Sequence, residues 1–527
     1  MNHLKHLILV IILIGIILRI LGLGLNIYTD ESIFLIETKD GFEGFGQIIN
    51  MHPPLSNFFY SLSTTIFGVS NFSMRIVPFT FGILTLIFTY LLTKQIYNDK
   101  NIAIASVFLL SISFWHIIAS LQIDIDGALL SFLFIAIFFF YLKYEHTKKK
   151  TYLIVAGGLF GLGALTKYPI VLVIPIITCY LIFSKNSIKH TIIITSIITF
   201  IGLLLFSIFP IISFISGSPY FYDTLKHSSG RLNFSLLPII YFIIWATPLL
   251  ILPLIFFKHK QTKNSLLLII WIAIPILFYI FIGTPYQSPY DRYLMIIIPP
   301  LAILGGEFIV GLGNFNKKHL FVFTATMLIA FFFLISLNLT TNIIPHGIPN
   351  YLKSIEKLNW RFYFPITGSS GPMTGIDFSS YAIVYIISII LGGLILYLKK
   401  TKGNYLQYLL SVFLAINIAL NLFISQEAIL NLTTPNFNKA ISDTRDYFFE
   451  NNLKLPIYTN QLSFLPYLNL ENEYNENSGI TKNYFSFTYN TRYPEINLLN
   501  ERIISKGGTI LVVDFPVIDK NSDLWNA

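Results

Sequence analysis

Long apolar runs recur along most of the chain, and they limit its fold more than any other feature of the sequence. A helix of about 20 apolar residues crosses the ~30 Å hydrocarbon core of a bilayer, where only helices and closed barrels satisfy their backbone hydrogen bonds. Charged residues make up 12% of the 527 residues, against roughly 25% in soluble domains. The sequence therefore predicts an all-α polytopic membrane protein and excludes a soluble enzyme.

These runs predict about thirteen transmembrane helices. The predicted spans lie near residues 7–25, 75–97, 101–117, 124–142, 152–166, 168–184, 191–215, 235–257, 265–283, 293–312, 320–340, 379–398 and 405–424. Because the first run is longer than the apolar region of a signal peptide, we interpret it as a retained span. The single cysteine, Cys179, lies inside a span and offers neither a disulfide nor a thiolate metal site.

Lysine is distributed unevenly between the connections on the two sides. With a cytoplasmic N-terminus, the inward connections hold sixteen lysines and two acidic residues, whereas the outward loop 26–74 holds five acidic residues and one lysine. Basic loops stay in the cytoplasm, so we expect a multi-pass protein of the plasma membrane. The net charge of +9 then reflects topology. Nucleic acid is excluded as a partner, and membrane lipid is expected.

Three longer segments are expected on the outer side. Loop 26–74 contains helical patterns at 31–38 and 54–67. Loop 341–378 is rich in proline and glycine, so we expect it to be irregular, as a lid over a site or as a plain connector. The third segment, from residue 425 onward, is more polar than the rest of the chain.

This last segment alternates between helical and strand patterns. The patterns are a helix at 437–451, a strand at Leu455–Thr459, a helix at 494–506 and a strand at 508–514. Such alternation is typical of an α/β fold. We therefore expect a transmembrane domain over residues 1–424 and a small extracytoplasmic α/β domain over residues 425–527.

Carboxylates stand at the outer edge of the predicted spans, where ionisable groups are functional candidates. Asp30 and Glu31 follow the first span, and Asp124 and Asp126 open the fourth. Residues two apart in a helix point about 200° apart, so we expect one of the second pair, Asp126, to face a cavity. Each pair by itself is also compatible with solvated loop charges.

Cations stand at the same edge: Arg75, Lys167 and Arg292, the last followed by Tyr293. A lipid that carries a phosphate requires such cations near its head group, and a hydroxyl nucleophile requires a carboxylate base. Both signs of charge therefore indicate a site at the outer rim. Each cation by itself is also compatible with an interfacial anchor.

Three further polar residues have more than one interpretation. His52 precedes two prolines that restrict the local backbone, and it is compatible with substrate binding, metal binding or helix capping. His116 lies among aromatic residues, and we interpret it as a packed side chain. Arg19 lies deeper in its span than the other cations, so it is the weakest candidate for a phosphate contact.

Taken together, these residues resemble the motifs of the GT-C glycosyltransferases of the protein O-mannosyltransferase and aminoarabinose-transferase type, glycosyltransferase family 39. The matching motifs are Asp30-Glu31, His52-Pro53-Pro54-Leu55, Ser73-Met74-Arg75-Ile76-Val77-Pro78, Gly161-Leu162-Gly163-Ala164-Leu165-Thr166-Lys167, and Arg292-Tyr293 with Pro299. The resemblance covers roughly residues 1–310. Because the motifs occur in order and on the expected side of the membrane, the set is far more specific than any one of them.

The resemblance implies a GT-C fold, a sugar donor linked to polyprenyl phosphate, and an extracytoplasmic acceptor that is a protein, a lipid or a glycan. It implies that Asp30 is the base, and we expect transfer with inversion. The expected catalytic residues are Asp30, Glu31 and Asp126, and the expected substrate-binding residues are His52, Arg75, Asp124, Lys167, Arg292 and Tyr293. Within this set Glu31 and Asp126 position the acceptor or a cation, while Arg292, Lys167 and Arg75 hold the phosphate.

The chain departs from the aminoarabinose transferases just before Pro53. They carry an acidic residue and a lysine there, and this chain carries Met51 and His52. The departure argues against a metal site copied from that subgroup and against lipid A as the acceptor. A divalent cation is the one cofactor that the residues leave open.

Two other functions also fit a chain with charges among its spans. A transporter or a flippase for lipid-linked sugars would place charges near the bilayer midplane and would show paired halves with broken helices. Here the charges stand at one edge and no halves repeat. A scaffold that binds glycans without catalysis would rest on the tail alone.

Overall fold

The computed structural model of the chain describes most of the membrane part and a smaller share of the tail. The described residues are 2–27, 31–38, 41, 53–215, 234–256, 265–282, 290–311, 316–339, 348–366, 375–401, 405–433, 437–451, 457–459, 484–486 and 509–511. Three predictions fall outside them, namely the roles of Asp30 and His52 and the helix at 494–506.

Apolar helices make up the membrane part. Among the described residues, those long and apolar enough to cross a membrane are α5 (Asn71–Tyr97), α8 (Ala128–Thr147), α11 (Ile188–Phe206) continued by α12 (Ile208–Ile215), α14 (Leu237–Phe256), α18 (Lys317–Asn338), α20 (Phe378–Thr401) and α21 (Leu406–Leu430). Shorter apolar helices are α1 (Asn2–Leu21) with η1 (Gly22–Gly24), α6 (Lys100–Ile112), α9 (Lys150–Ala164), η2 (Tyr168–Leu172) with α10 (Val173–Phe183), α15 (Ser265–Phe281), and η3 (Met295–Ile297) with α17 (Ile298–Gly311). The prediction of a multi-pass, mostly helical membrane protein is confirmed, and the count of thirteen spans stays a prediction.

Smaller elements lie between and after these helices. They are α2 (Glu31–Thr38), α4 (Leu55–Phe67), α7 (Phe114–Ala119), α16 (Tyr290–Tyr293), α19 (Ile348–Glu356), α22 (Phe437–Glu450), β1 (Tyr363–Pro365), β2 (Gly375–Asp377), β3 (Ile457–Thr459), β4 (Tyr484–Ser486) and β5 (Thr509–Leu511). The first two coincide with the helical patterns predicted in the outer loop, so that prediction is confirmed.

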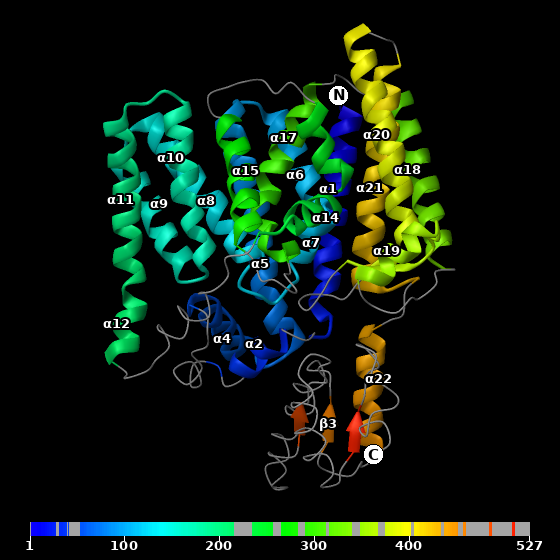
Figure 1. Ribbon diagram of the computed structural model, residues 1–527, viewed down its shortest axis with the longest axis horizontal. Coiled ribbons are helices and arrows are strands. Elements are labelled where there is room, and N and C mark those ends of the chain that lie inside the picture. The colour runs from blue at the N-terminus through cyan, green and yellow to red at the C-terminus, as the bar shows by residue number, and fades with distance from the viewer. Residues whose placement is uncertain are drawn as a thin grey trace.

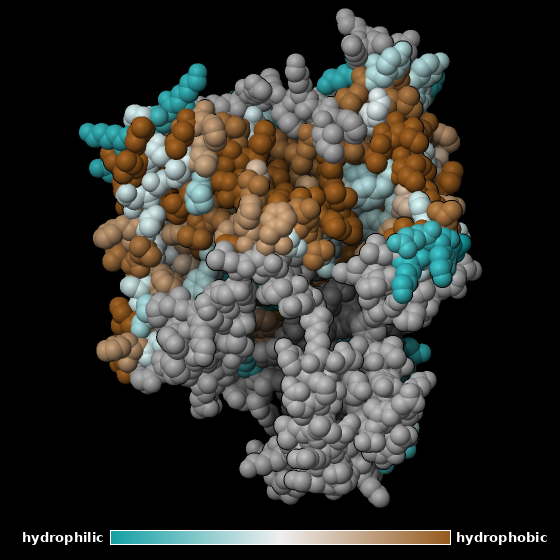
Figure 2. Space-filling view, in the orientation of Figure 1, coloured by the Kyte–Doolittle hydropathy of each residue, from teal (hydrophilic) through white to brown (hydrophobic). Residues whose placement is uncertain are grey.

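The membrane helices stand side by side, with the N-terminus at the upper end of the bundle (Figure 1). Helices α2, α4 and α19 lie at the lower end, and α22 and β3 lie below it (Figure 1). Hydrophobic side chains cover the middle of the bundle, and hydrophilic side chains lie at its upper corners and at its lower right (Figure 2). The segments expected outside therefore share one end of the bundle. That this end faces away from the cytoplasm stays a prediction from the lysine distribution.

Two local features fix the starts of α4 and α5 at this end of the bundle. The amide N of Leu55 donates a hydrogen bond to the carbonyl O of Leu165, over 2.8 Å, so the start of α4 lies against the end of α9. The next helix, α5, begins with a capping box in which Ser70 and Ser73 exchange hydrogen bonds, an arrangement that satisfies the first amides of a helix. The outer loop therefore returns to the bundle at a defined point.

The helical path of α6 and α7 is interrupted inside the bundle, and polar side chains stabilise both ends of the interruption. Arg19 of α1 is fully buried and donates to the carbonyl O of Ser111, over 2.8 Å, and to Nδ1 of His116, over 2.7 Å. Asn421 of α21 accepts a hydrogen bond from the amide N of Phe114, over 3.1 Å. Backbone groups freed in a bilayer need such partners. Arg19 therefore supports the fold, and His116 is packed as expected.

The outer segment after α18 is more regular than predicted. It contains α19 and an antiparallel hairpin in which Tyr363 of β1 pairs with Asp377 of β2. Arg361 donates from Nε to Oδ2 of the buried Asp377 over 3.0 Å. The expectation of an irregular loop is therefore wrong for these residues, because the ion pair and the hairpin order them. Both interpretations of its role, as a lid and as a plain connector, stay predictions.

The tail contains a three-stranded parallel sheet with the order β4-β3-β5. Strands β3 and β5 and helix α22 fall within patterns predicted from the sequence. Most of the chain after residue 451 lies outside the described residues. The separate α/β domain over residues 425–527 therefore stays a prediction.

Candidate active site

An irregular segment between α7 and α8 carries Asp124 and Asp126. The predicted helix start at residue 124 is wrong, because α8 begins at Ala128 and the preceding residues 120–127 are not helical. Tyr60 of α4 holds this segment through two hydrogen bonds. Its hydroxyl donates to the carbonyl O of Asp124, over 3.1 Å, and accepts from the amide N of Asp124, over 3.0 Å. The geometry of a helix therefore does not separate the two carboxylates.

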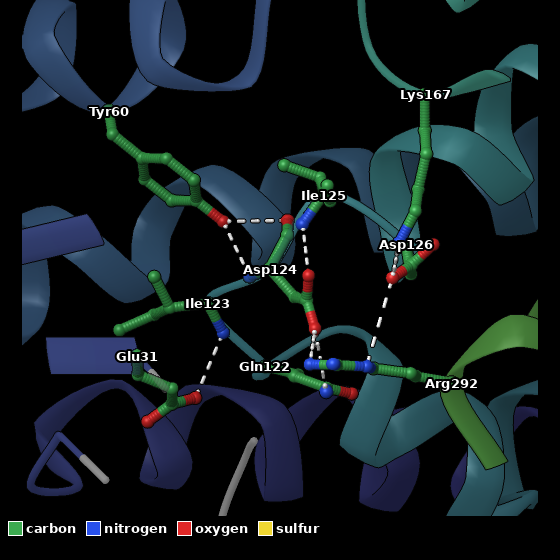
Figure 3. Close-up of polar contacts among 9 residues, drawn as sticks. All are labelled: Glu31, Tyr60, Gln122, Ile123, Asp124, Ile125, Asp126, Lys167 and Arg292. Atoms are coloured by element: carbon green, nitrogen blue, oxygen red, sulfur yellow. Dashed lines mark hydrogen bonds and ion pairs between the residues drawn. The ribbon is translucent and has the colours of Figure 1, made fainter. Parts of the chain in front are cut away.

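Arg292 contacts both of these carboxylates (Figure 3). Its Nη1 lies 2.7 Å from Oδ2 of Asp124, and its Nε lies 3.8 Å from Oδ2 of Asp126. The expectation that only one of the pair faces the site is thus wrong, since the unwound backbone turns both toward one cation. The side chains of Asp124 and Asp126 are 3% and 1% exposed, whereas that of Arg292 is 16% exposed.

Lys167 completes a group of four charged side chains, which we call the charge quartet: Asp124, Asp126, Lys167 and Arg292. Lys167 lies between α9 and η2 with an extended backbone conformation, and its Nζ makes an ion pair with Oδ2 of Asp126. The ring of Tyr293 lies beneath this amine, with the ring centroid 4.7 Å from Nζ. Helix α9 ends at Ala164, three residues before Lys167, so the lysine lies in the break between α9 and η2.

The two carboxyl groups differ in their proton affinity. Burial by itself would raise the pKa of Asp124, but Arg292 and Lys167 hold that pKa below its ordinary value. Burial and the nearby negative charge of Asp124 raise the pKa of Asp126, although Lys167 opposes the shift. Environments that move two carboxyl pKa values apart are typical of functional sites.

Arg75 and Glu31 form a separate ion pair that is fully buried. Their two contacts are Nη1 to Oε1, 3.1 Å, and Nη2 to Oε2, 2.9 Å. Arg75 also donates to the carbonyl oxygens of Leu25, Asn26 and Leu121. All five of its N–H groups are thereby used, which is the full capacity of a guanidinium.

The expected roles of this pair therefore need correction. A phosphate contact by Arg75 would require it to leave the partners that join α1, α2, α5 and the segment after α7. Glu31 accepts a further hydrogen bond from the amide N of Ile123, over 2.9 Å, so it holds the segment that carries the quartet. We therefore assign Arg75 and Glu31 a positioning role.

Several contacts of this site could not be predicted from the sequence. Tyr60 belongs to α4 and Gln122 to the irregular segment, and both hold Asp124, Gln122 through Nε2 at 3.3 Å from Oδ2. Neither residue stands in a charged motif, so only their place beside Asp124 reveals them. Asp30 and His52 lie outside the described residues. Within the part of the chain that the structure describes, no group of three His, Cys, Asp or Glu residues is placed to hold a metal ion.

The quartet can bind an anion at the end of the bundle where α4 lies. Lys167 and Arg292 retain partial exposure, at 14% and 16% of their side-chain surfaces, while the carboxylates behind them are buried. Buried carboxylates hold the cations in place, and the exposed parts of the cations can contact a phosphate. This arrangement is chemically suited to an anionic group such as a phosphate.

The fold and this site define a multi-pass membrane protein with a charged site at one end of its helices. The structure resembles ArnT from Cupriavidus metallidurans, both in the apo state and bound to undecaprenyl phosphate. Each comparison has a TM-score of 0.54 and 14% sequence identity, and covers 88% of this chain and 85% of that chain. At this level of identity the likeness concerns the fold.

Sequence comparisons find similarity to membrane glycosyltransferases as well. Residues 51–212 match the family described as Dolichyl-phosphate-mannose-protein mannosyltransferase. The chain is 33% identical over 140 residues to the undecaprenyl phosphate-alpha-4-amino-4-deoxy-L-arabinose arabinosyl transferase of Wigglesworthia glossinidia brevipalpis, and that match covers 25% of each protein. It is also 33% identical over 132 residues to an uncharacterised protein of Aquifex aeolicus strain VF5, over 25% of this chain and 26% of the relative.

The matches thus span about a quarter of the length of these curated relatives. Together with the fold, they confirm the resemblance predicted from the motifs. The chain resembles GT-C glycosyltransferases of the O-mannosyltransferase and aminoarabinose-transferase type.

Proposed function

We propose that the protein is a membrane glycosyltransferase that moves a sugar from a polyprenyl-phosphate donor to an acceptor outside the cytoplasm. The observation that carries the proposal is the charge quartet, in which two partly exposed cations stand over two buried carboxylates at one end of the bundle. A lipid phosphate can reach this place while its prenyl chain stays in the bilayer. The similarity to an arabinosyl transferase named for an undecaprenyl-phosphate donor supports the same substrate class.

In the proposed reaction, Asp30 takes the proton of the acceptor hydroxyl as its oxygen attacks the anomeric carbon of the sugar. The bond between that carbon and the phosphate oxygen breaks, and the prenyl phosphate leaves. Arg292 and Lys167 stabilise the charge that the phosphate gains. The single displacement inverts the anomeric configuration and needs no protein nucleophile. Asp30 stands directly before Glu31, whose ion pair with Arg75 fixes the start of α2.

The proposed acceptor is a protein, a lipid or a glycan. The test is a transfer assay in which membranes that contain the protein are incubated with radiolabelled undecaprenyl-phosphate sugars. We expect label to move from the lipid to a second product. Movement of intact lipid-linked sugar between leaflets, without a second product, would instead identify a flippase and contradict the proposal.

Variants connect the activity to the site. Asp30→Asn removes the proposed base, and we expect transfer to fall by about 10²–10⁴. Arg292→Gln removes a phosphate contact and should weaken both donor binding and turnover. Glu356→Gln is the matched control, because Glu356 is an exposed acidic residue of α19 outside the site. Near-normal transfer by Asp30→Asn would refute the role assigned to Asp30.

A further inference from the structure

The four side chains of the charge quartet carry no net charge among themselves. Asp124 and Asp126 contribute two negative charges, and Lys167 and Arg292 contribute two positive charges. These are the charged groups that face Asp126 in the described part of the chain, from the segment before α8, from the break after α9 and from α16. The phosphodiester of a polyprenyl-phosphate sugar carries one negative charge. Its binding would leave the group with a net charge of −1.

A net charge beside buried carboxylates is unfavourable, and such groups usually respond by changing protonation. We propose that the protein takes up one proton when it binds the phosphate of its lipid donor, and that Asp126 receives this proton. The inference rests on the proposed function, because it names a property of the same donor site. Protonation of Asp126 restores the balance: one carboxylate and one phosphate then face two cations.

The hydrogen bonds distinguish Asp126 from Asp124. Both oxygens of Asp124 are engaged, Oδ1 by the amide N of Ile125 over 2.6 Å and Oδ2 by Arg292 over 2.7 Å. In Asp126, Oδ2 is paired with Lys167, while the buried Oδ1 has no hydrogen-bond partner among the described residues. A proton on Oδ1 turns that oxygen into a donor. Protonation would therefore break no hydrogen bond at Oδ1.

The directions of the pKa shifts agree with this choice. The pKa of Asp124 is held low by Arg292 and Lys167 despite its burial, whereas burial and the charge of Asp124 raise the pKa of Asp126. Arrival of an anion would raise the pKa of Asp126 further. At pH values where Asp126 is ionised in the free protein, binding is coupled to the uptake of one proton. The affinity for the lipid then falls about tenfold for each unit by which the pH rises.

The probe is the methyl ester of undecaprenyl phosphate, a phosphodiester that has no titratable group near neutral pH. Its binding to the purified full-length protein is measured by calorimetry in two buffers with different ionisation enthalpies. The buffer dependence of the heat gives the number of protons taken up. We expect about one proton per probe bound by the unaltered protein, and an affinity that falls as pH rises.

Asp126→Asn replaces the carboxyl with a neutral amide of nearly the same shape, which cannot take up a proton. This variant should bind the probe with an affinity that no longer depends on pH, and the proton uptake should disappear. Glu37→Gln is the matched control, because Glu37 is another buried carboxyl at the same end of the bundle, whose pKa burial raises to about 7. It should leave the uptake unchanged.

The outcomes separate this inference from the function on which it rests. Binding without proton uptake, or unchanged uptake in Asp126→Asn, overturns the inference and leaves the donor site in place. No binding of the probe by the unaltered protein counts against the proposed function itself. If Asp126→Asn does not fold, the buffer and pH series on the unaltered protein still decides whether a proton is taken up.

Discussion

At the scale of single residues, two arginines that the sequence places at the same edge of the predicted spans, Arg75 and Arg292, have different surroundings. Arg75 is fully buried, and its five N–H groups are all bound by protein oxygens. Arg292 is partly exposed, contacts Asp124 and Asp126, and shares Asp126 with Lys167. Burial and hydrogen-bond capacity therefore distinguish a structural arginine from one that can contact a ligand.

The assignment of Arg75 predicts a loss of stability. Arg75→Met would leave the Glu31 carboxylate buried without its partner, and breaking a buried pair in this way costs about 3–5 kcal/mol. Thermal unfolding of the purified protein in detergent should therefore shift to lower temperature. The double variant Arg75→Met with Glu31→Gln removes the orphaned charge and should regain part of the loss.

Binding of undecaprenyl phosphate by that double variant is the control. If Arg75 acts only through position, the folded double variant keeps the affinity of the unaltered protein to within a few-fold. A loss of binding in a variant that remains folded would show that Arg75 contacts the phosphate after all.

At the scale of elements, helices α2 and α4 meet through a polar contact between Asn57 and Glu37. Asn57 of α4 donates from Nδ2 to Oε2 of Glu37 over 2.9 Å, and Oε1 of Glu37 has no hydrogen-bond partner among the described residues. Burial raises the pKa of Glu37 to about 7, against an ordinary value of 4.5, although Asn57 opposes the shift. Burial thus favours the neutral carboxyl of Glu37 and outweighs the hydrogen bond from Asn57, which favours the ionised form.

The sign of the pH dependence follows from linkage. Between pH 4.5 and about 7 the folded protein binds more protons at Glu37 than the unfolded chain does. The free energy of unfolding therefore falls as pH rises through this range, by at most on the order of 3 kcal/mol. Unfolding followed at pH 5 and pH 8 should show this loss, and Glu37→Gln should reduce it. An equal pH dependence in Glu37→Gln would contradict the assignment.

At the scale of the whole molecule, the lysine distribution predicts which end of the bundle faces the cytoplasm. Lys148 lies in a connection expected inside, with a side chain that is 59% exposed. Glu356 is exposed at the end of α19, in a segment expected outside. The quartet lies at the same end of the bundle as α2 and α4, so its access to an extracytoplasmic acceptor depends on this orientation.

Cysteine labelling tests the orientation directly. Cys179 is the only cysteine, so Cys179→Ser supplies a background without thiols. On that background we expect Glu356→Cys to react with an impermeant maleimide in intact cells. Lys148→Cys should react only after the membrane is opened. The reverse pattern would place the site in the cytoplasm and would exclude the proposed acceptor side.

Much of the fold could be predicted from local patterns of hydrophobicity in the sequence. The apolar runs predicted membrane helices, and the helical patterns at 31–38 and 54–67 correspond to α2 and α4. These features depend on hydrophobicity and on residues close in the chain. The charges at the rim were recognisable for the same reason, since ionisable groups stand out against apolar spans.

Only the tertiary structure decided which charges pair. Arg75 turns inward to Glu31, whereas Arg292 contacts Asp124, 168 residues away in the sequence. The irregular segment before α8, held by Tyr60 from another helix, brings Asp126 to the same cation. A pairing of this kind depends on which helices become neighbours and on where a helix unwinds. Both result from packing across the whole bundle, and no local pattern in the sequence encodes them.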